Sequence, residues 1–306
     1  MADKPDAKAK PPAAAPKPKG GGGIKPDIAT LAGIGMALAG ILGGLILEKG
    51  SIQDVAQVTA AMIVLGGTFG AVLVTTPLPV FLRAMKGMRD VFLEQSSTTS
   101  ATIETLIGFA TQARKNGIVS LEAEAAKITE PYLRKALNLA VDGTDLNELR
   151  KMMEIDIELS EQAADAEAKV WEAAGGYSPT IGIIGAVMGL IQVMKHLDDI
   201  KEVGHGIAVA FVATVYGVAA ANILFLPAAG KLKAKVHKAK IVKEMVLEGV
   251  IGIVEGLNPT LIRMKLTAFN LEPEAPKKQA PDPKGAKAGA KAGAKGGAPQ
   301  AAPAEN

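Results

Sequence analysis

Uncharged polar side chains that can bind or relay an ion occur within four long apolar runs of this chain. The runs span residues 28–47, 55–82, 173–194 and 206–230, and none contains Asp, Glu, Lys, Arg or His. Their polar groups are hydroxyls and amides, among them Thr30, Gln57, Thr59, Thr68, Thr180, Gln192, Thr214, Tyr216 and Asn222. Such groups commonly hydrogen-bond between apolar helices, whereas proton transporters usually hold an ionisable group at membrane depth. If this protein moves an ion, a partner must supply the titrating group.

The composition gives little support to catalysis, metal binding or nucleic-acid binding. The chain has no cysteine, which excludes disulfides, Fe–S clusters and thiol catalysis, and its three histidines are too scattered for a metal site. No nucleophile–base pair or metal cluster supports an enzyme, and no cofactor is implied. The net charge of +3 gives no broad field for binding nucleic acid.

The four apolar runs predict an all-α membrane protein. Each run reaches the roughly 20 residues that a helix needs to cross a bilayer. The first run is not a cleavable signal peptide, because it is too long and follows a polar tail of 27 residues. The fold class we expect is four transmembrane helices with a helical cytoplasmic domain between the second and the third.

Lysine and arginine counts predict the orientation in the membrane. The loops 48–54 and 195–205 carry one and two of these residues, whereas the segments 1–27, 83–172 and 230–306 carry six, eleven and fourteen. Because cytoplasmic loops are enriched in these cations, we expect both termini and the middle segment in the cytoplasm.

The chain therefore divides into six predicted parts. They are a disordered basic tail (1–27), helices 1 and 2 (28–82), a cytoplasmic helical domain (83–172), helices 3 and 4 (173–230), a cytoplasmic C-terminal helix (231–271) and a second disordered tail (272–306). In the middle domain, apolar spacing predicts a helix over 96–116, and Ser120 is expected to begin another. A long amphipathic helix, capped by Thr144 or Asp145, should run to Ala174 and on towards the membrane.

The run GGYSPTIGIIGAVMGL, residues 175–190, is typical of a packed transmembrane helix. Its proline, Pro179, is tolerated at the first turn of a helix. The small residues Gly182, Gly185, Ala186 and Gly189 allow close approach of helix backbones and should face neighbouring helices. The preceding Trp171 is expected to anchor the chain at the membrane interface.

Several segments together resemble the MotA family of flagellar stator subunits. They are AAGGYSPTIGIIGAVMGLI, VATVYGVAAANILFLPAA, the cytoplasmic ARKNGIVSLEAE and the loop GGLILEKGSIQDV, and the likeness runs from about Ile28 to Ala268. The resemblance implies a homo-oligomer of five copies around a MotB-like subunit, which has one membrane span, binds peptidoglycan and supplies the missing acid.

The resemblance also implies roles for particular residues. Pro179 matches the proline that opens the third helix and couples ion passage to movement, and Pro227 matches the proline that ends the fourth. Thr214 matches the threonine that faces the partner's ion-carrying aspartate. Arg114 and Glu122 match the charged pair that acts on the rotor switch protein FliG.

The predicted function is thus a stator subunit in the bacterial inner membrane, in contact with lipid, that couples ion flow to torque. Ala186 stands where sodium-driven relatives usually carry threonine, which favours a proton as the ion. Two alternatives stay open at this point: an ExbB- or TolQ-like energising subunit, and a stator-like unit for a non-flagellar process. The first usually has three membrane helices and a periplasmic N-terminus, unlike the arrangement expected here.

Overall fold

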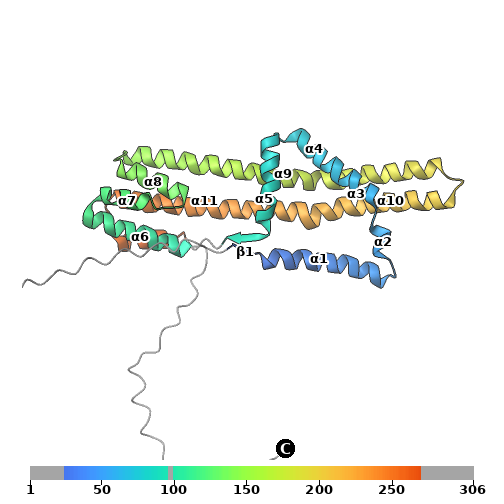
Figure 1. Ribbon diagram of the computed structural model, residues 1–306, viewed down its shortest axis with the longest axis horizontal. Helices are drawn as coiled ribbons and strands as arrows, with labels where there is room; N and C mark the ends of the chain where they lie inside the picture. The colour runs from blue at the N-terminus through green and yellow to red at the C-terminus, as the bar shows by residue number, and fades with distance from the viewer. Residues whose placement is uncertain (1–23, 96–98, 270–306) are drawn as a thin grey trace, which may run out of the picture. The chain divides into compact units, whose positions relative to one another are not determined.

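The computed structural model describes residues 24–95 and 99–269 of the 306-residue chain (Figure 1). Most of the two tails that are expected to be disordered, 1–27 and 272–306, therefore lies outside the described residues.

The described chain is almost entirely helical. Its α-helices are α1 (Ile28–Leu47), α2 (Ile52–Val55), α3 (Val58–Ala61), α4 (Gly67–Thr75), α5 (Leu78–Val91), α6 (Thr99–Asn116), α7 (Glu122–Ala125), α8 (Pro131–Val141), α9 (Leu146–Lys195), α10 (Ile200–Ala219), α11 (Leu226–Val254) and α12 (Pro259–Thr267). π-Helical segments at Met62–Gly66 and Ala220–Phe225 join α3 to α4 and α10 to α11, and a 3₁₀ turn at Ile118–Leu121 precedes α7. The all-α fold is confirmed.

Two short strands are an exception that the sequence did not predict. β1 (Ile24–Pro26) pairs antiparallel with β2 (Leu93–Gln95), and Pro26 lies opposite Leu93. The pairing continues into a backbone hydrogen bond of 2.9 Å from Asp27 to the carbonyl of Phe92. It therefore joins the segment before α1 to the segment after α5.

Four helical stretches are long and apolar enough to cross a membrane. They are Ile28–Leu47, Val58–Thr75, the helix Leu146–Lys195 and the passage Ile200–Val254. The chain is accordingly a multi-pass membrane protein. The expected second run, 55–82, is not one helix, because α4 ends at Thr75 and α5 begins at Leu78. Pro77 explains the break, since proline disfavours helical geometry in the residue before it.

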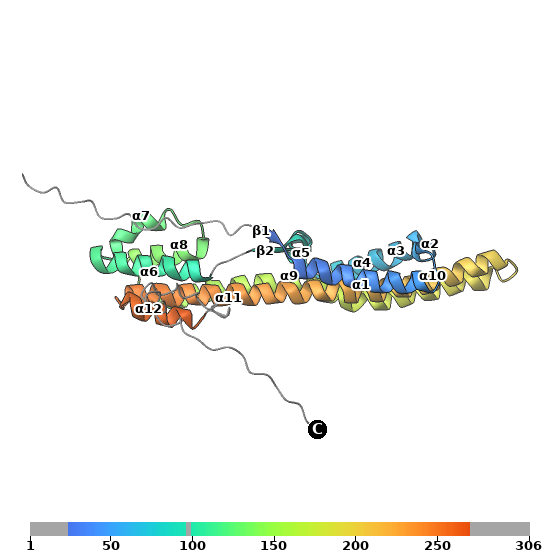
Figure 2. The ribbon, with the colours of Figure 1, turned by 90° about the horizontal axis from the view of Figure 1, so that it is seen from below.

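The longest element, α9, continues without interruption from the polar part of the chain into the apolar part. Asp145 caps its first turn by accepting hydrogen bonds from the backbone amides of Asn147 and Glu148, at 2.9 and 3.4 Å. α10 and α11 return alongside it, so that these elements form one long antiparallel pair (Figures 1 and 2). The expectation of a continuous helix from the Asp145 cap is confirmed.

A distal bundle forms at the end of this pair that lies away from α10. It contains α6, α7, α8, α12, the first part of α9 and the last part of α11, around a core that includes Leu106, Leu137, Leu149 and Ile251. Ser120 does not begin a helix as expected. It lies in the 3₁₀ turn, where its hydroxyl donates to the carbonyl of Gly117 at 2.7 Å, and α7 begins two residues later.

Trp171 is not the interfacial anchor that its position in the sequence suggested. Only 3% of it is exposed, and its ring packs against Phe69 and Phe225, with centroids 6.4 and 5.9 Å away. Since the three rings come from α9, α4 and the π-helical segment Ala220–Phe225, they join three membrane passages.

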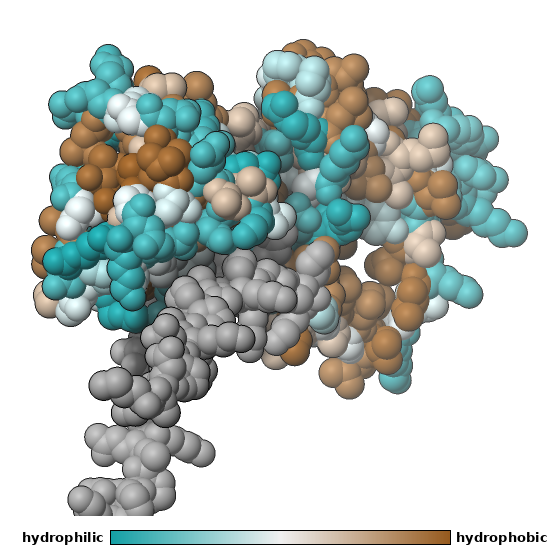
Figure 3. All heavy atoms as spheres, turned by 60° about the vertical axis from the view of Figure 1, so that its left-hand side comes forward, coloured by the Kyte–Doolittle hydropathy of each residue, from teal (hydrophilic) through white to brown (hydrophobic). Residues whose placement is uncertain are grey.

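α1 contrasts with the other membrane passages. None of its residues is buried, and apolar side chains such as Met36 (76% exposed) and Ile41 (51%) face outward. Figure 3 shows hydrophobic side chains gathered over this helix, low in that view. Its apolar surface is therefore available to lipid or to other membrane helices.

Candidate functional site

The second half of α9 packs against α10 through a row of glycines. A Cβ atom on Gly182 would lie 2.9 Å from the carbonyl oxygen of Ala213, and one on Gly189 would lie 2.8 Å from the amide nitrogen of Ala210. A Cβ on Gly185 would lie 2.7 Å from the Cβ of Ala213. The two backbones are therefore in direct contact, and the glycines face a helix of their own chain.

Pro179 lies inside α9 rather than in its first turn, so the interpretation of this residue as the start of a helix is wrong. Because proline has no N–H, the carbonyl of Gly175 lacks its usual partner in the helix. The neighbouring Ser178 is fully buried, and its hydroxyl has no hydrogen-bond partner among the described residues. The i→i−4 ladder is thus interrupted at one place within an otherwise continuous helix.

Pro227 likewise does not end a helix. It is the second residue of α11, and the helical path continues through it from Ile200 to Val254. The preceding π-helical segment, Ala220–Phe225, accommodates it, since π-bulges occur within α-helices and frequently lie at functional sites. Leu226 packs on Gly175, where its Cδ2 lies 2.5 Å from an added Cβ. The two prolines therefore lie near the same end of the α9–α10 contact.

Thr214 lies on α10 beside this glycine row. Its Cα is 3.4 Å from the position of a Cβ on Gly182, and its hydroxyl donates to the carbonyl of Ala210 at 3.3 Å. Ala186 follows Gly182 by one helical turn and is half-buried. The structure thus places Pro179, Ala186 and Thr214 along one stretch of the helix pair, where the Thr214 oxygen still has lone pairs free to accept.

Arg114 and Glu122 lie on either side of the turn that follows α6. Both are exposed, and neither forms an ion pair with any residue of the described ranges. Nearby Glu124 differs, because it binds Lys127 at 2.9 Å. Gly117 makes the turn with a φ of 82°, which L side chains rarely adopt. The two charges are therefore free to meet a partner.

The described residues do not form a candidate metal site. Among residues 24–95 and 99–269, no group of three or more His, Cys, Asp or Glu side chains lies close enough to hold a metal ion.

The comparisons with known proteins agree with this arrangement. The model of the MotA/TolQ/ExbB proton channel family matches residues 124–245, and the model of the motility protein A N-terminal region matches residues 31–117. Motility protein A of Helicobacter pylori is 36% identical over 252 residues, which cover 82% of this chain and 98% of that protein. The chain belongs to the MotA/TolQ/ExbB proton channel family.

Two solved structures are similar to this MotA-family chain over nearly their whole length. One is the C. jejuni MotAB structure, with a TM-score of 0.77 and 33% identity, covering 82% of this chain and 98% of that one. The other is the flagellar MotAB stator complex of Bacillus subtilis, with a TM-score of 0.73 and 33% identity over 78% and 94% of the two chains. The likeness extends over both the membrane passages and the distal bundle.

Two polar contacts of this MotA-family chain were not predicted. Asp27 caps α1 and binds Lys231 of α11, with Oδ2 and Nζ 2.5 Å apart. The hydrogen bonds from Lys231 and from the Thr30 amide lower the pKa of Asp27 from 3.8 to about 2. The hydroxyl of Tyr216 donates to the carbonyl of Val55 at 2.5 Å. An Asp three residues before Thr30, directly in front of an apolar run, indicates a helix cap. No local sequence pattern identifies the distant partners, Lys231 for Asp27 and Val55 for Tyr216.

Proposed function

We propose that this chain forms, with a single-span MotB-like subunit, the ion-conducting stator unit of a flagellar motor. The observation that carries the proposal is the apolar part of the α9–α10 pair, residues 173–194 and 206–219. It combines an interrupted helix at Pro179 with a hydroxyl at Thr214 and contains no Asp, Glu, Lys, Arg or His. Family membership and the similarity to two MotAB structures support a stator subunit.

The partner supplies the titrating group in this proposal. An aspartate within a ring of apolar helices retains its proton, because removal from water raises the pKa of a carboxyl group. The Thr214 hydroxyl hydrogen-bonds that carboxyl or a water beside it. Each protonation changes the charge at the centre of the ring, and α9 bends at Pro179, where its hydrogen-bond ladder is interrupted.

The same proposal assigns the mechanical output to the distal bundle. α9 is one helix from Leu146 to Lys195, so bending near Pro179 moves the bundle. Arg114 and Glu122 then act on the rotor switch protein FliG by charge, since exposed charges at an interface mainly steer association. Five copies surround the partner, both termini lie in the cytoplasm, and α1 faces lipid or a neighbouring copy in the inner membrane.

The ExbB- or TolQ-like alternative is not favoured. The motility protein A N-terminal model covers the first membrane passages of this chain, and the described residues contain four apolar passages. A stator-like unit that serves another process shares all these features, and swimming of a deletion strain distinguishes it.

The test of the proposal is reversal of one exposed charge. We expect Arg114→Glu to abolish or strongly reduce swimming while the chain still inserts in the membrane and co-purifies with its MotB-like partner. A charge-reversed FliG should partly restore swimming. Lys169→Glu is the matched control, because it reverses an exposed cation of α9 whose ion pair is with Asp165, one turn away on the same helix. Normal swimming of Arg114→Glu would show that the rotor contact is misassigned.

A further inference from the structure

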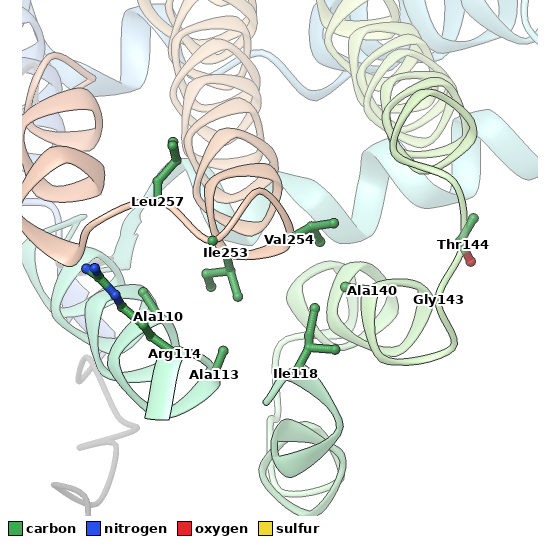
Figure 4. A pocket seen from close by; sticks show the side chains of 11 residues that line it. Ala110, Ala113, Arg114, Ile118, Ala140, Gly143, Thr144, Ile253, Val254 and Leu257 are labelled. Carbon is green, nitrogen blue, oxygen red and sulfur yellow. The ribbon is translucent and has the colours of Figure 1, made fainter. Parts of the chain in front are cut away.

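The free end of the distal bundle contains an apolar cavity of about 350 Å³. Its walls come from α6, the 3₁₀ turn, the turn between α8 and α9, and the turn between α11 and α12 (Figure 4). Ile118 and Ile253 point into it from opposite sides, and Ala113 lies along its α6 wall (Figure 4). A cavity of this size accepts one or two large apolar side chains.

The backbone turns at the ends of two helices shape the mouth of this cavity. Gly143, two residues after the end of α8, has a φ of 75°, and the Thr144 amide donates to the carbonyl of Leu139 at 3.1 Å. Gly256 follows the end of α11 in the same way with a φ of 69°, and the Leu257 amide donates to the carbonyl of Gly252 at 3.0 Å. Both are Schellman motifs, which end helices sharply. The fixed turns present Thr144 and Leu257 at the rim.

The charge around the cavity indicates what kind of partner it takes. Arg114 is the one charged side chain among the described residues that line it. Lys115 follows Arg114 in α6, and Val119 on the adjoining turn is 64% exposed. A partner that fits therefore offers an apolar side chain next to a carboxylate. A second copy of this chain would bring the same cations against Arg114 and Lys115, which disfavours self-association here.

We propose that this cavity is the docking pocket for the rotor protein, and that it receives an apolar side chain whose acidic neighbour pairs with Arg114. The inference rests on the proposed function and adds the apolar contact to it. The two contacts have different kinetic consequences. An exposed charge pair mainly raises the association rate and makes it dependent on salt, whereas burial of an apolar side chain mainly slows dissociation.

The absence of cysteine from the sequence makes the pocket directly testable. In the purified full-length stator complex, Ala113→Cys introduces a thiol in the cavity wall with little change in volume. We expect saturating rotor protein to slow its alkylation by iodoacetamide about tenfold, as measured by mass spectrometry of this chain. Ala101→Cys, on the exposed face of the same helix, is the matched control and should react at the same rate with and without rotor protein.

A second variant fills the pocket. Ala113→Phe should weaken binding of the rotor protein about tenfold or more, in line with the loss of a buried anchor, with an unchanged salt dependence and an intact complex. Ala101→Phe should bind like the unaltered chain. If Ala113→Phe fails to fold, the alkylation result alone decides.

Two outcomes separate the inference from the proposed function. If bound rotor protein leaves the thiol at position 113 as reactive as before, the pocket is not the docking site, even though Arg114→Glu still prevents binding. If Arg114→Glu binds rotor protein as tightly as the unaltered chain, the rotor contact of the proposed function is wrong and the inference is overturned with it.

Discussion

Asp27 and Lys231, which are 204 positions apart in the chain, form an ion pair at the start of the first membrane helix. The carboxylate is only 6% exposed and also accepts a hydrogen bond of 3.1 Å from the Thr30 amide. Since no residue of α1 is buried, this pair and the β1–β2 ladder are the principal attachment of that helix among the described residues. The pair fixes where α1 begins relative to α11.

The first prediction follows from this attachment. Asp27→Asn should lower the thermal unfolding midpoint of the purified complex at pH 7 by more than Glu172→Gln does, because the Glu172–Lys233 pair, which also involves α11, is about 40% exposed at each side chain. The folded-state pKa of Asp27, about 2, lies below its ordinary value of 3.8, so its contribution to stability is present above pH 4.

That contribution disappears as the pH falls from about 4 to about 2, and the midpoints of the Asp27→Asn variant and the unaltered chain should then converge. A difference between them that stays constant over this range would contradict the assignment to the Asp27 charge.

The second prediction concerns Tyr216, whose hydroxyl joins α10 to the segment before α3. It donates to the carbonyl of Val55 and accepts from the Gln57 amide at 3.3 Å. Tyr216→Phe leaves both backbone groups without this partner and should cost about 1–2 kcal/mol of unfolding free energy. Tyr177→Phe is the control, because no hydrogen bond of that hydroxyl is found among the described residues. Denaturant titration of both variants should separate them, and equal losses would remove the role given to Tyr216.

The third prediction concerns the direct contact between the α9 and α10 backbones. In Gly182→Ala the new Cβ meets the carbonyl of Ala213 at 2.9 Å, and a backbone atom cannot rotate away as a flexible side chain can. We expect a loss of about 1–3 kcal/mol and a lower yield of assembled complex. Gly176→Ala, on the same helix with no atom within 4 Å of the added Cβ, should be neutral or stabilising. Because α10 of the same chain fills the space beside Gly182 and Gly185, substitution there first damages the subunit and only then the ring.

Local patterns predict much of this fold, since the causes are themselves local. Asp145 caps α9 because its side chain reaches amides two and three residues away, and the four apolar passages follow from hydropathy. Tertiary packing decides what these patterns miss. Trp171 is buried because Phe69 and Phe225 arrive from other passages, and Pro179 is tolerated within α9 because packing against α10 holds the helix on both sides of the missing hydrogen bond. The Asp27–Lys231 pair joins residues too far apart for any sequence pattern to connect.

The fourth prediction tests the hydroxyl of Thr214. Thr214→Val keeps the shape of the side chain and removes its donor and acceptor, so it should abolish swimming without reducing the amount of assembled complex. Thr214→Ser keeps the hydroxyl and should retain most of the swimming speed. Full motility of the valine variant would mean that the ion passes without help from this oxygen.

The last prediction is that the conducted ion is a proton. Ala186 is half-buried on α9 and has no side-chain oxygen. Of the two residues, Thr214 on α10 is therefore the one that supplies a hydroxyl to the proposed ion site. A sodium ion needs several oxygens to replace the water that it loses, whereas a proton needs an acid and a hydrogen-bonded path. Swimming speed should therefore stay constant across a series of sodium concentrations at fixed pH and collapse when a protonophore is added. A speed that rises with sodium and survives the protonophore would instead require oxygen ligands from the partner or from backbone carbonyls freed near Pro179.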